Sequence, residues 1–597
     1  MKRAGLFLLI LFLCISCAKE NSRQDETDTA EVSSPLRLWE FMCKNGESAL
    51  NTAHPRTWVE VKNVSDTTIS LRPYSLSDKK NKPGQVRLEK DSLAPGEIVL
   101  VKDKDDKLNG DIVFLMKDTI VIDSLDAKKT YFGVSIGRRE NSKDLYYFDN
   151  PTPGKENVGG FTKVAKNGEV HYTLDGSIPT MKSPIFDKKL VLKKTTVVRK
   201  RTFKEGQLPG KVSTKTYFVK EQSKLPIVSI SMDPKDLYDE QTGIYVHGPK
   251  PVTDYPYPEA NYWQPWERRA HIEFIDGKDG FSYDCGIKIF GGFSRFREKK
   301  SFQIKFRTSY DQHRLKYDIY GDGKSGKVKS LILRSGSQDD DGTMVRDEFF
   351  TTLMAKSSPT LYVQKNRAVT LYINGEYFGV YFIREKINKY FVANKLGVKP
   401  QSVTLLQGLQ TAEEGTNDEY KKLLNYVKTH DIRQKDAYEY VKSKVDFQSL
   451  IDFKIGEYYA GNSDVGNVRF FKSDDPSCDG KWHWIYYDLD WGFHHTNSLD
   501  YYVSSTGPKA SFNVLISRLR TNPEFEKRFQ KRLRYHAVHT FEKNHALAVF
   551  DSLVSVIKPE MERNCQRWSR MSYPNWCKNV LNFRESIVKK SDLIPSK

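Results

Sequence analysis

This 597-residue chain has few long apolar runs, few closely spaced cysteines and no excess of acidic residues. Beyond residue 13, no apolar segment is long enough to cross a bilayer as a helix. Apart from Cys14 and Cys17, the cysteines show no CxxC spacing, which argues against a structural zinc site. The 95 basic residues outnumber the 76 acidic ones and give a formal charge of +19. Because the lysines are scattered and no zinc-finger or RNA-binding signature occurs, we expect no nucleic-acid partner.

Aromatic and other apolar residues are plentiful, at 12% and 38% of the chain. This composition is typical of ordered globular domains, and the abundant Tyr and Phe favour sheets and contact surfaces for carbohydrate or protein. A single hydrophobic core rarely grows beyond about 250–300 residues, so the length predicts several domains.

The N-terminus predicts a lipid-anchored protein. Lys2 and Arg3 precede a short apolar run, and Ser16 and Cys17 follow it like a lipoprotein cleavage site. We expect residues 1–17 to be the signal peptide, with the Cys17 thiol diacylated and residues 18–34 forming a polar tether. This predicts a location at the bacterial outer membrane or cell surface. The alternative is ordinary secretion with cleavage elsewhere.

Residues 35–158 read as short strands separated by turns. The segment from Trp58 to Asn63 alternates with period two, and a Pro95-Gly96 turn leads into another apolar strand. With the closing segment 151–157, this pattern resembles lamin-tail domains. The resemblance implies an immunoglobulin-like β-sandwich with no catalytic role of its own.

Residues 159–222 form a second predicted all-β unit. The run from Tyr172 to Thr180 contains Asp175-Gly176, a pair that favours a tight turn between strands. This run resembles the small β-sandwich at the C-terminus of chitobiases and β-hexosaminidases. The resemblance implies a spacer, and a glycan contact is the alternative.

Two acidic segments predict a metal-dependent site in the rest of the chain. Asp488 and Asp490 follow an apolar strand, and residues two apart in extended backbone share a face. Oxygen donors of this kind suit a hard cation such as Mg²⁺. Asp464 and Asn467 follow a predicted helix over 447–460, and an acid, an amide and a second acid in this order are typical of kinase-like sites. The alternative is an acidic turn that caps a strand.

Basic residues follow a glycine turn further upstream. Gly291-Gly292 would let backbone approach a phosphate, with Arg295 beside it. Lys300 and Lys305 come next and are candidates for holding nucleotide phosphates, although solvated strand lysines are commoner. An Asn374-Gly375 pair predicts a hairpin that ends near Glu385, where a hinge strand would pass a nucleotide base.

These motifs, in this order, resemble the spore coat protein H (CotH) kinases. The matching runs are Gly291-Gly292-x-Ser294-Arg295, 299–306, 345–347, 372–385 and 484–490. The resemblance spans roughly 225–590, within a predicted domain at 223–597, and implies an α+β, divergent protein-kinase-like fold that moves the γ-phosphate of ATP to serines of partner proteins.

The resemblance also assigns roles to residues. It implies Asp464 as catalytic acid/base, Asp488 as metal ligand, and Arg295, Lys300 or Lys305 near the phosphates; Asn467 and Asp490 are further candidate metal ligands. Asn467 lies three residues beyond Asp464, where family members usually place the amide four or five beyond. This shorter spacing puts the role of Asn467 in question.

The sequence therefore predicts a surface-anchored kinase that uses ATP with Mg²⁺ or Mn²⁺ to phosphorylate serine or threonine hydroxyls of envelope or secreted proteins. A second hypothesis is a catalytically inert adhesion or glycan-associated scaffold, because ATP supply outside the cell is unexplained. A third is polysaccharide binding through exposed Trp and Tyr.

Overall fold

The computed structural model describes residues 34–593, except 45–56, 104, 106, 253, 313, 324–325, 465–466, 496 and 508. The predicted signal peptide and Cys17 therefore lie outside the described residues. Among the helices that are described, none is long and apolar enough to cross a membrane. All five described cysteines are free, including Cys565 and Cys577, the two nearest in sequence.

The first unit consists of two main sheets around one core. The larger sheet has the order β11-β10-β1-β2-β7 and the smaller one β5-β4-β8-β9. Leu38 and Val59 from the first sheet share a buried cluster with Leu76 and Leu115 from the second, so the two sheets face each other as layers of a sandwich. The immunoglobulin-like character of this sandwich stays a prediction. The strands are β1 (Leu36–Met42), β2 (Trp58–Asn63), β4 (Tyr74–Ser77), β5 (Val86–Arg87), β7 (Ile98–Lys102), β8 (Ile112–Lys117), β9 (Ile120–Asp126), β10 (Ser135–Gly137) and β11 (Tyr146–Phe148), with β3 (Ile69–Ser70) and β6 (Ser92–Leu93) as a separate pair.

The second unit is one antiparallel sheet, β12 (Glu169–Thr173), β13 (Thr196–Phe203) and β14 (Ser213–Tyr217). The sequence predicted a sandwich here. The described residues of this segment form no second sheet, and the strand β14 contacts the neighbouring barrel. Thr216 donates from its N–H to the Glu273 carboxylate at 2.8 Å, and its hydroxyl lies 2.8 Å from that of Ser229.

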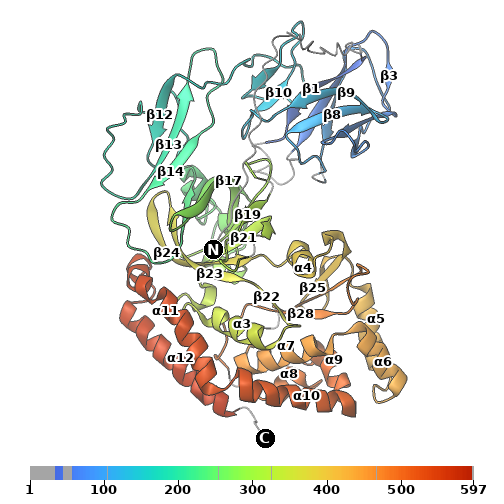
Figure 1. Ribbon diagram of the computed structural model, residues 1–597, viewed down its shortest axis with the longest axis vertical. Helices are drawn as coiled ribbons and strands as arrows, with labels where there is room; N and C mark the ends of the chain where they lie inside the picture. The colour runs from blue at the N-terminus through green and yellow to red at the C-terminus, as the bar shows by residue number, and fades with distance from the viewer. Residues whose placement is uncertain are drawn as a thin grey trace, which may run out of the picture.

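The third unit begins with a closed barrel in the order β15-β16-β17-β18-β21-β24-β23 (Figure 1). The barrel closes through a parallel pair, β15 with β23. Phe302 and Ile304 belong to its buried core. The predicted Asn374-Gly375 turn joins β23 to β24 with positive φ at both residues. The strands are β15 (Ile227–Ser231), β16 (Arg268–Asp276), β17 (Asp279–Phe290), β18 (Ser301–Lys305), β21 (Ser330–Arg334), β23 (Asn366–Ile373) and β24 (Glu376–Glu385), with β19 (Leu315–Tyr317) and β20 (Gly326–Val328) as a separate hairpin.

A mixed sheet and a group of helices complete the chain. The sheet order is β22-β28-β27-β25-β26, and its core joins that of the helices in the largest hydrophobic cluster. In Figure 1, α3, β22 and β28 lie between the barrel and the lower helices, and α11 runs beside α12. The strands are β22 (Tyr362–Val363), β25 (Val403–Gln407), β26 (Thr411–Glu414), β27 (Arg469–Ser473) and β28 (His483–Tyr486). The helices are α2 (Pro234–Tyr238), α3 (Arg346–Ser357), α4 (Lys389–Leu396), α5 (Asp418–Thr429), α6 (Lys435–Lys444), α7 (Phe447–Ala460), α8 (Leu499–Val503), α9 (Ala510–Leu519), α10 (Pro523–Tyr535), α11 (Lys543–Arg567) and α12 (Tyr573–Leu593).

Helix α7 has the bounds that its apolar periodicity predicted. Asp446 caps its first turn by accepting the Ser449 N–H, and Gly461 ends it with a φ of 63°. The chain therefore turns sharply where α7 ends. An all-β N-terminal part followed by a mixed α/β part agrees with the predicted fold class at this level.

Candidate active site

Asp464 and Asp488 come together through the Asn467 side chain. The Asn467 amide nitrogen lies 2.8 Å from Asp464 Oδ2 and 2.7 Å from Asp488 Oδ2. Asp464 follows the C-terminal end of α7, and Asp488 follows β28, so the two elements deliver their acids to one place. The short spacing between Asp464 and Asn467 is compatible with this meeting.

Asp488 and Asp490 share a site for a reason other than the predicted one. Asp488 does not continue the strand: β28 ends at Tyr486, and Asp488 takes a left-handed backbone with a φ of 63°. A non-glycine residue in this conformation is strained and needs support from its surroundings. The next residue, Leu489, supplies that support because it is buried and donates its N–H to Asp347 at 3.0 Å.

Arg334 joins the two acids from the barrel side. Its guanidinium, at the end of β21, lies 2.6 Å from Asp488 Oδ1 and 2.7 Å from Asp490 Oδ2. Burial lowers the pKa of Arg334, but the carboxylates of Asp488, Asp490 and Asp347 outweigh it and raise that pKa overall. The cation therefore stays charged and neutralises part of the acidic cluster.

Asp490 differs from Asp488 in its surroundings. Asp490 is 5% exposed, and it accepts the Gln338 N–H at 3.2 Å. Burial, followed by the charge of Asp488, raises its pKa to about 7 although Arg334 opposes the change. The side chain of Asp488 is 25% exposed. Of the two acids, Asp488 is thus the one open to a ligand.

A second, fully buried ion pair fastens the barrel to α3. Arg384 of β24 forms hydrogen bonds to Asp347 and Glu348 in the first turn of the helix. Because Asp347 also accepts the Leu489 N–H, this pair supports the turn that carries Asp488. Sequence reasoning missed Arg334 and Arg384, since only the barrel register shows which strand residues meet α3.

The Asp464 loop is held by Asn462. This side chain is 2% exposed, accepts the Asp464 N–H at 3.1 Å and donates to the Glu457 carboxylate at 3.0 Å. Its backbone carbonyl accepts a hydrogen bond from Lys509 at 2.8 Å. Burial raises the pKa of Glu457 to about 7, with Lys509 among the groups that oppose the change. Asn462 therefore fixes the backbone from which Asp464 projects.

A basic face of the barrel lies next to the acids. Lys288, Gln303, Ile332 and Arg384 pair in register on β17, β18, β21 and β24, so they share the face opposite the barrel core. Lys305 lies on the same face, two residues beyond Gln303.

Further cations lie around Lys288. Lys305 is its diagonal neighbour on β18, and Lys386 donates to Gln303, the strand partner of Lys288, at 3.4 Å. Burial lowers the pKa of Lys288 to about 8, and the charges of Lys305, Arg295 and Lys386 add to this effect. Lys288 and Lys386 were missed because an alternating strand pattern does not show which lysines converge.

Two residues predicted to lie near phosphates already have partners. Lys305 forms an ion pair with Glu267 at 2.6 Å. The Arg295 guanidinium donates to the backbone carbonyls of Gly291, Tyr262 and Trp263.

Lys300 and Glu385 occupy other positions. Lys300 is buried and donates to the carbonyls of Arg295 and Arg297, each at 2.7 Å, so it holds the loop after Gly291-Gly292 closed. Glu385 accepts a hydrogen bond from the Lys365 N–H at 2.8 Å and forms an ion pair with Lys395 at 3.0 Å. Neither side chain has a described hydrogen bond or ion pair to the acidic cluster.

The donor set at the acids fits a hard divalent cation. Asp488 offers carboxylate oxygens, and Asn467 would present its carbonyl oxygen if the amide turned over. Asp490 fits less well because its side chain is only 7% exposed, against 25% for Asp488. The basic face beside the acids suits the oxygens of a polyphosphate.

A cavity of about 250 Å³ opens at the far end of this face. Gln303, Lys305 and Ser330 line it from the barrel, and Leu108 and Asn109 line it from the first sandwich. The Thr308 hydroxyl donates to the Asn109 carbonyl at 3.0 Å across this junction. The first sandwich therefore forms one wall beside Lys305.

Comparison with protein families gives two matches. Residues 287–593, just over half of the chain, match the family model described as CotH kinase protein. Residues 161–217, which fall within the second predicted unit, match the family model described as Fn3 associated. No curated protein matches the chain in sequence. The first match begins inside β17, so the barrel strands β15 and β16 lie before it, and it includes every acid of the cluster described above.

Proposed function

Because the chain belongs to the CotH kinase protein family, we propose that it transfers the γ-phosphate of ATP to serine or threonine hydroxyls of envelope or secreted proteins. The observation that carries this proposal is the meeting of Asp464 and Asp488 at Asn467. An acid for the acceptor hydroxyl next to an acid for a metal ion is the arrangement that phosphoryl transfer needs.

Asp464 is the residue proposed to orient the acceptor hydroxyl and to take its proton as the oxygen attacks the γ-phosphorus. A Mg²⁺ or Mn²⁺ ion held by Asp488 and Asn467 would offset negative charge on the phosphate oxygens. Lys288 and Lys386 are the cations proposed to hold the α- and β-phosphates, and Lys305 would join them on leaving its ion pair with Glu267. The bond that breaks joins the γ-phosphorus to its bridging oxygen, and ADP leaves.

Arg334 and Asp490 are proposed as positioning residues. Arg334 holds the strained Asp488 turn from the barrel, and Asp490 helps to hold Arg334. Asp490 was predicted from the sequence as a metal ligand; its burial and its two hydrogen-bond partners favour the positioning role instead.

The location and the partner belong to the proposal as well. A lipid on Cys17 would tether the protein at the outer membrane or cell surface, and the acceptor would then be a protein of the envelope or one in transit. The polar segment 18–34 supports a tether, since it is rich in Asp, Glu, Ser and Thr.

The direct test is phosphate transfer from γ-labelled ATP by the full chain to candidate envelope proteins. Asp488→Asn should lower transfer by about 100-fold or more, because it removes one charge where the transition state needs it. Asp500→Asn changes an exposed acid on α8 and should leave transfer unchanged. Equal transfer by Asp488→Asn and the wild type would refute the role of Asp488.

The ion pairs of Arg334 favour a second candidate function, an inert surface scaffold. Its guanidinium already neutralises both Asp488 and Asp490, as a metal ion would. The two functions differ in ligand binding: a rise in melting temperature with Mg-ATP supports the kinase, because a ligand of the folded state stabilises it. No rise with Mg-ATP supports the scaffold, and a rise with glycans alone points to polysaccharide binding.

A further inference from the structure

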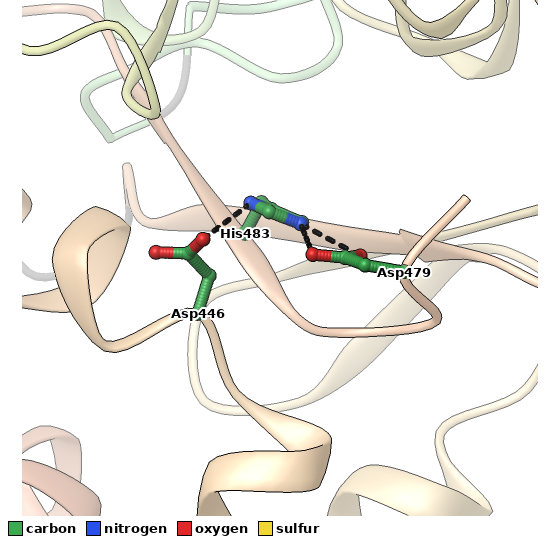
Figure 2. Close-up of side chains that lie close together, drawn as sticks. All are labelled: Asp446, Asp479 and His483. Atoms are coloured by element: carbon green, nitrogen blue, oxygen red, sulfur yellow. Dashed lines mark hydrogen bonds and ion pairs between the residues drawn. The ribbon is translucent and has the colours of Figure 1, made fainter.

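Three titratable side chains gather away from the acidic cluster, where α7 and β28 begin. Asp446 is the cap of α7, His483 is the first residue of β28, and Asp479 lies in the turn before it. Figure 2 shows the imidazole between the two carboxylates, with one ring nitrogen facing each of them. This group has no part in the proposed phosphate transfer.

The two ring nitrogens have different surroundings. Nε2 lies 3.1 Å from each carboxylate oxygen of Asp479, which is hydrogen-bond distance. A proton on Nε2 donated to Asp479 leaves a lone pair on Nδ1. Nδ1 is buried without a hydrogen-bond partner, in a residue that is only 9% exposed, and it faces Asp446 Oδ2 at 3.9 Å.

We propose that His483 Nδ1 and Asp446 Oδ2 bind a divalent transition-metal ion such as Zn²⁺, with Asp479 orienting the imidazole. Two ligands that each lie about 2.0–2.2 Å from one ion are at most about 4.4 Å apart. The observed 3.9 Å is within that limit and is too long for a direct hydrogen bond. Water would complete the coordination. The carboxylate–histidine–metal order is the usual arrangement of a metal-binding histidine and its supporting acid.

The site is held in shape before any ion binds. Tyr362 packs edge-on against the His483 ring, and Phe471 stacks on it. In both pairs the centroid of the aromatic ring lies 5.7 Å from that of the imidazole. The Asp446 N–H donates to the Trp482 carbonyl at 3.1 Å, which fixes the cap of α7 beside β28. Because Asp446 Oδ1 accepts the Ser449 N–H at 2.7 Å, Oδ2 is the oxygen left to bind the ion.

Charge also favours a cation. Two carboxylates flank the imidazole in this arrangement, and a divalent ion would balance their charge. The ion would tie the start of α7 to the start of β28, and these two elements carry Asp464 and Asp488 at their other ends. The inference does not depend on phosphate transfer.

Titration calorimetry of the full chain with ZnCl₂ tests the proposal. We expect a binding event that is lost in His483→Gln and in Asp446→Asn but is kept in Asp488→Asn, which alters the separate cation site proposed above. Asparagine is as good a helix cap as aspartate, so Asp446→Asn removes the charged ligand while α7 keeps its cap. His430→Gln changes an exposed histidine and should bind as the wild type does. Asp479→Asn should weaken binding by about 10–100-fold, as expected for a supporting acid.

Co²⁺ gives an independent readout, because its visible absorption reports nitrogen and oxygen ligands at one ion. The proposal predicts a Co²⁺ spectrum in the wild type that Zn²⁺ displaces and that His483→Gln lacks. Absence of any Zn²⁺ binding at about 1 mM would overturn the proposal. Binding that His483→Gln and Asp446→Asn leave unchanged would also overturn it, since the ion would then lie elsewhere.

Discussion

Asn462→Ala should separate the positioning of Asp464 from its chemistry. The substitution removes two hydrogen bonds, one to the Asp464 N–H and one to the Glu457 carboxylate. A neutral hydrogen bond contributes about 1 kcal/mol and one to a charged group about 1.5–3 kcal/mol, so the free energy of unfolding should fall by roughly 3 kcal/mol. Lys509 keeps its hydrogen bond to the backbone carbonyl of residue 462 and limits the damage.

The same change should lower kcat for phosphate transfer by about 10–100-fold, because a small misplacement of a reacting group has effects of this size. KM for ATP should change little, since Asn462 contacts neither the basic face nor Asp488 in the described structure. Urea unfolding followed by tryptophan fluorescence measures the stability, and initial rates at low urea measure the transfer. Asn544→Ala, at an exposed position on α11, is the matched control. Transfer within twofold of wild type by folded Asn462→Ala would refute the positioning role.

Two further predictions concern the basic face and the first sandwich. Lys288→Met should raise KM for ATP about tenfold, which corresponds to a loss of roughly 1.4 kcal/mol of phosphate binding. The control Lys316→Met, at an exposed strand position, should leave KM unchanged. Equal KM values for Lys288→Met and the wild type would exclude Lys288 from the site. Burial raises the pKa of Glu60 to about 8, and the charge of neighbouring Glu40 adds to the rise. A carboxyl with a raised pKa in the folded state stabilises it at low pH and loses that contribution as the pH rises toward 8. As the pH rises from 5 to 8, the urea concentration at the midpoint of unfolding should therefore fall less in Glu60→Gln than in the wild type or in the control Glu205→Gln. Parallel curves of midpoint against pH would contradict this reasoning.

Local patterns predicted local elements well. Helix α7 has an apolar periodicity, an aspartate cap and a C-terminal glycine, and all three signals are contained in neighbouring residues. The β23–β24 hairpin follows from Asn374-Gly375 for the same reason. Elements of this kind depend on short-range sterics and hydrogen bonds, so one sequence is enough to find them.

Such local patterns do not predict contacts between strands that are far apart in the sequence. Arg334 and Arg384 reach the acids only because β21 and β24 pair within a closed barrel, and no spacing in the sequence encodes that register. Lys300 is a further case: the sequence predicts a lysine near phosphates after a glycine turn, and in the structure its ammonium donates to backbone carbonyls of its own loop. Asp488 shares a site with Asp490 through a left-handed turn rather than through the alternation of a strand.

A structure of the full chain with Mg²⁺ and a non-hydrolysable ATP analogue tests the central claim most directly. The account predicts a metal ion at about 2.1 Å from an Asp488 oxygen, with the γ-phosphate facing Asp464 and the other phosphates on the face that carries Lys288. A nucleotide bound elsewhere, with Arg334 still paired to both Asp488 and Asp490 and no ion at Asp488, would contradict it.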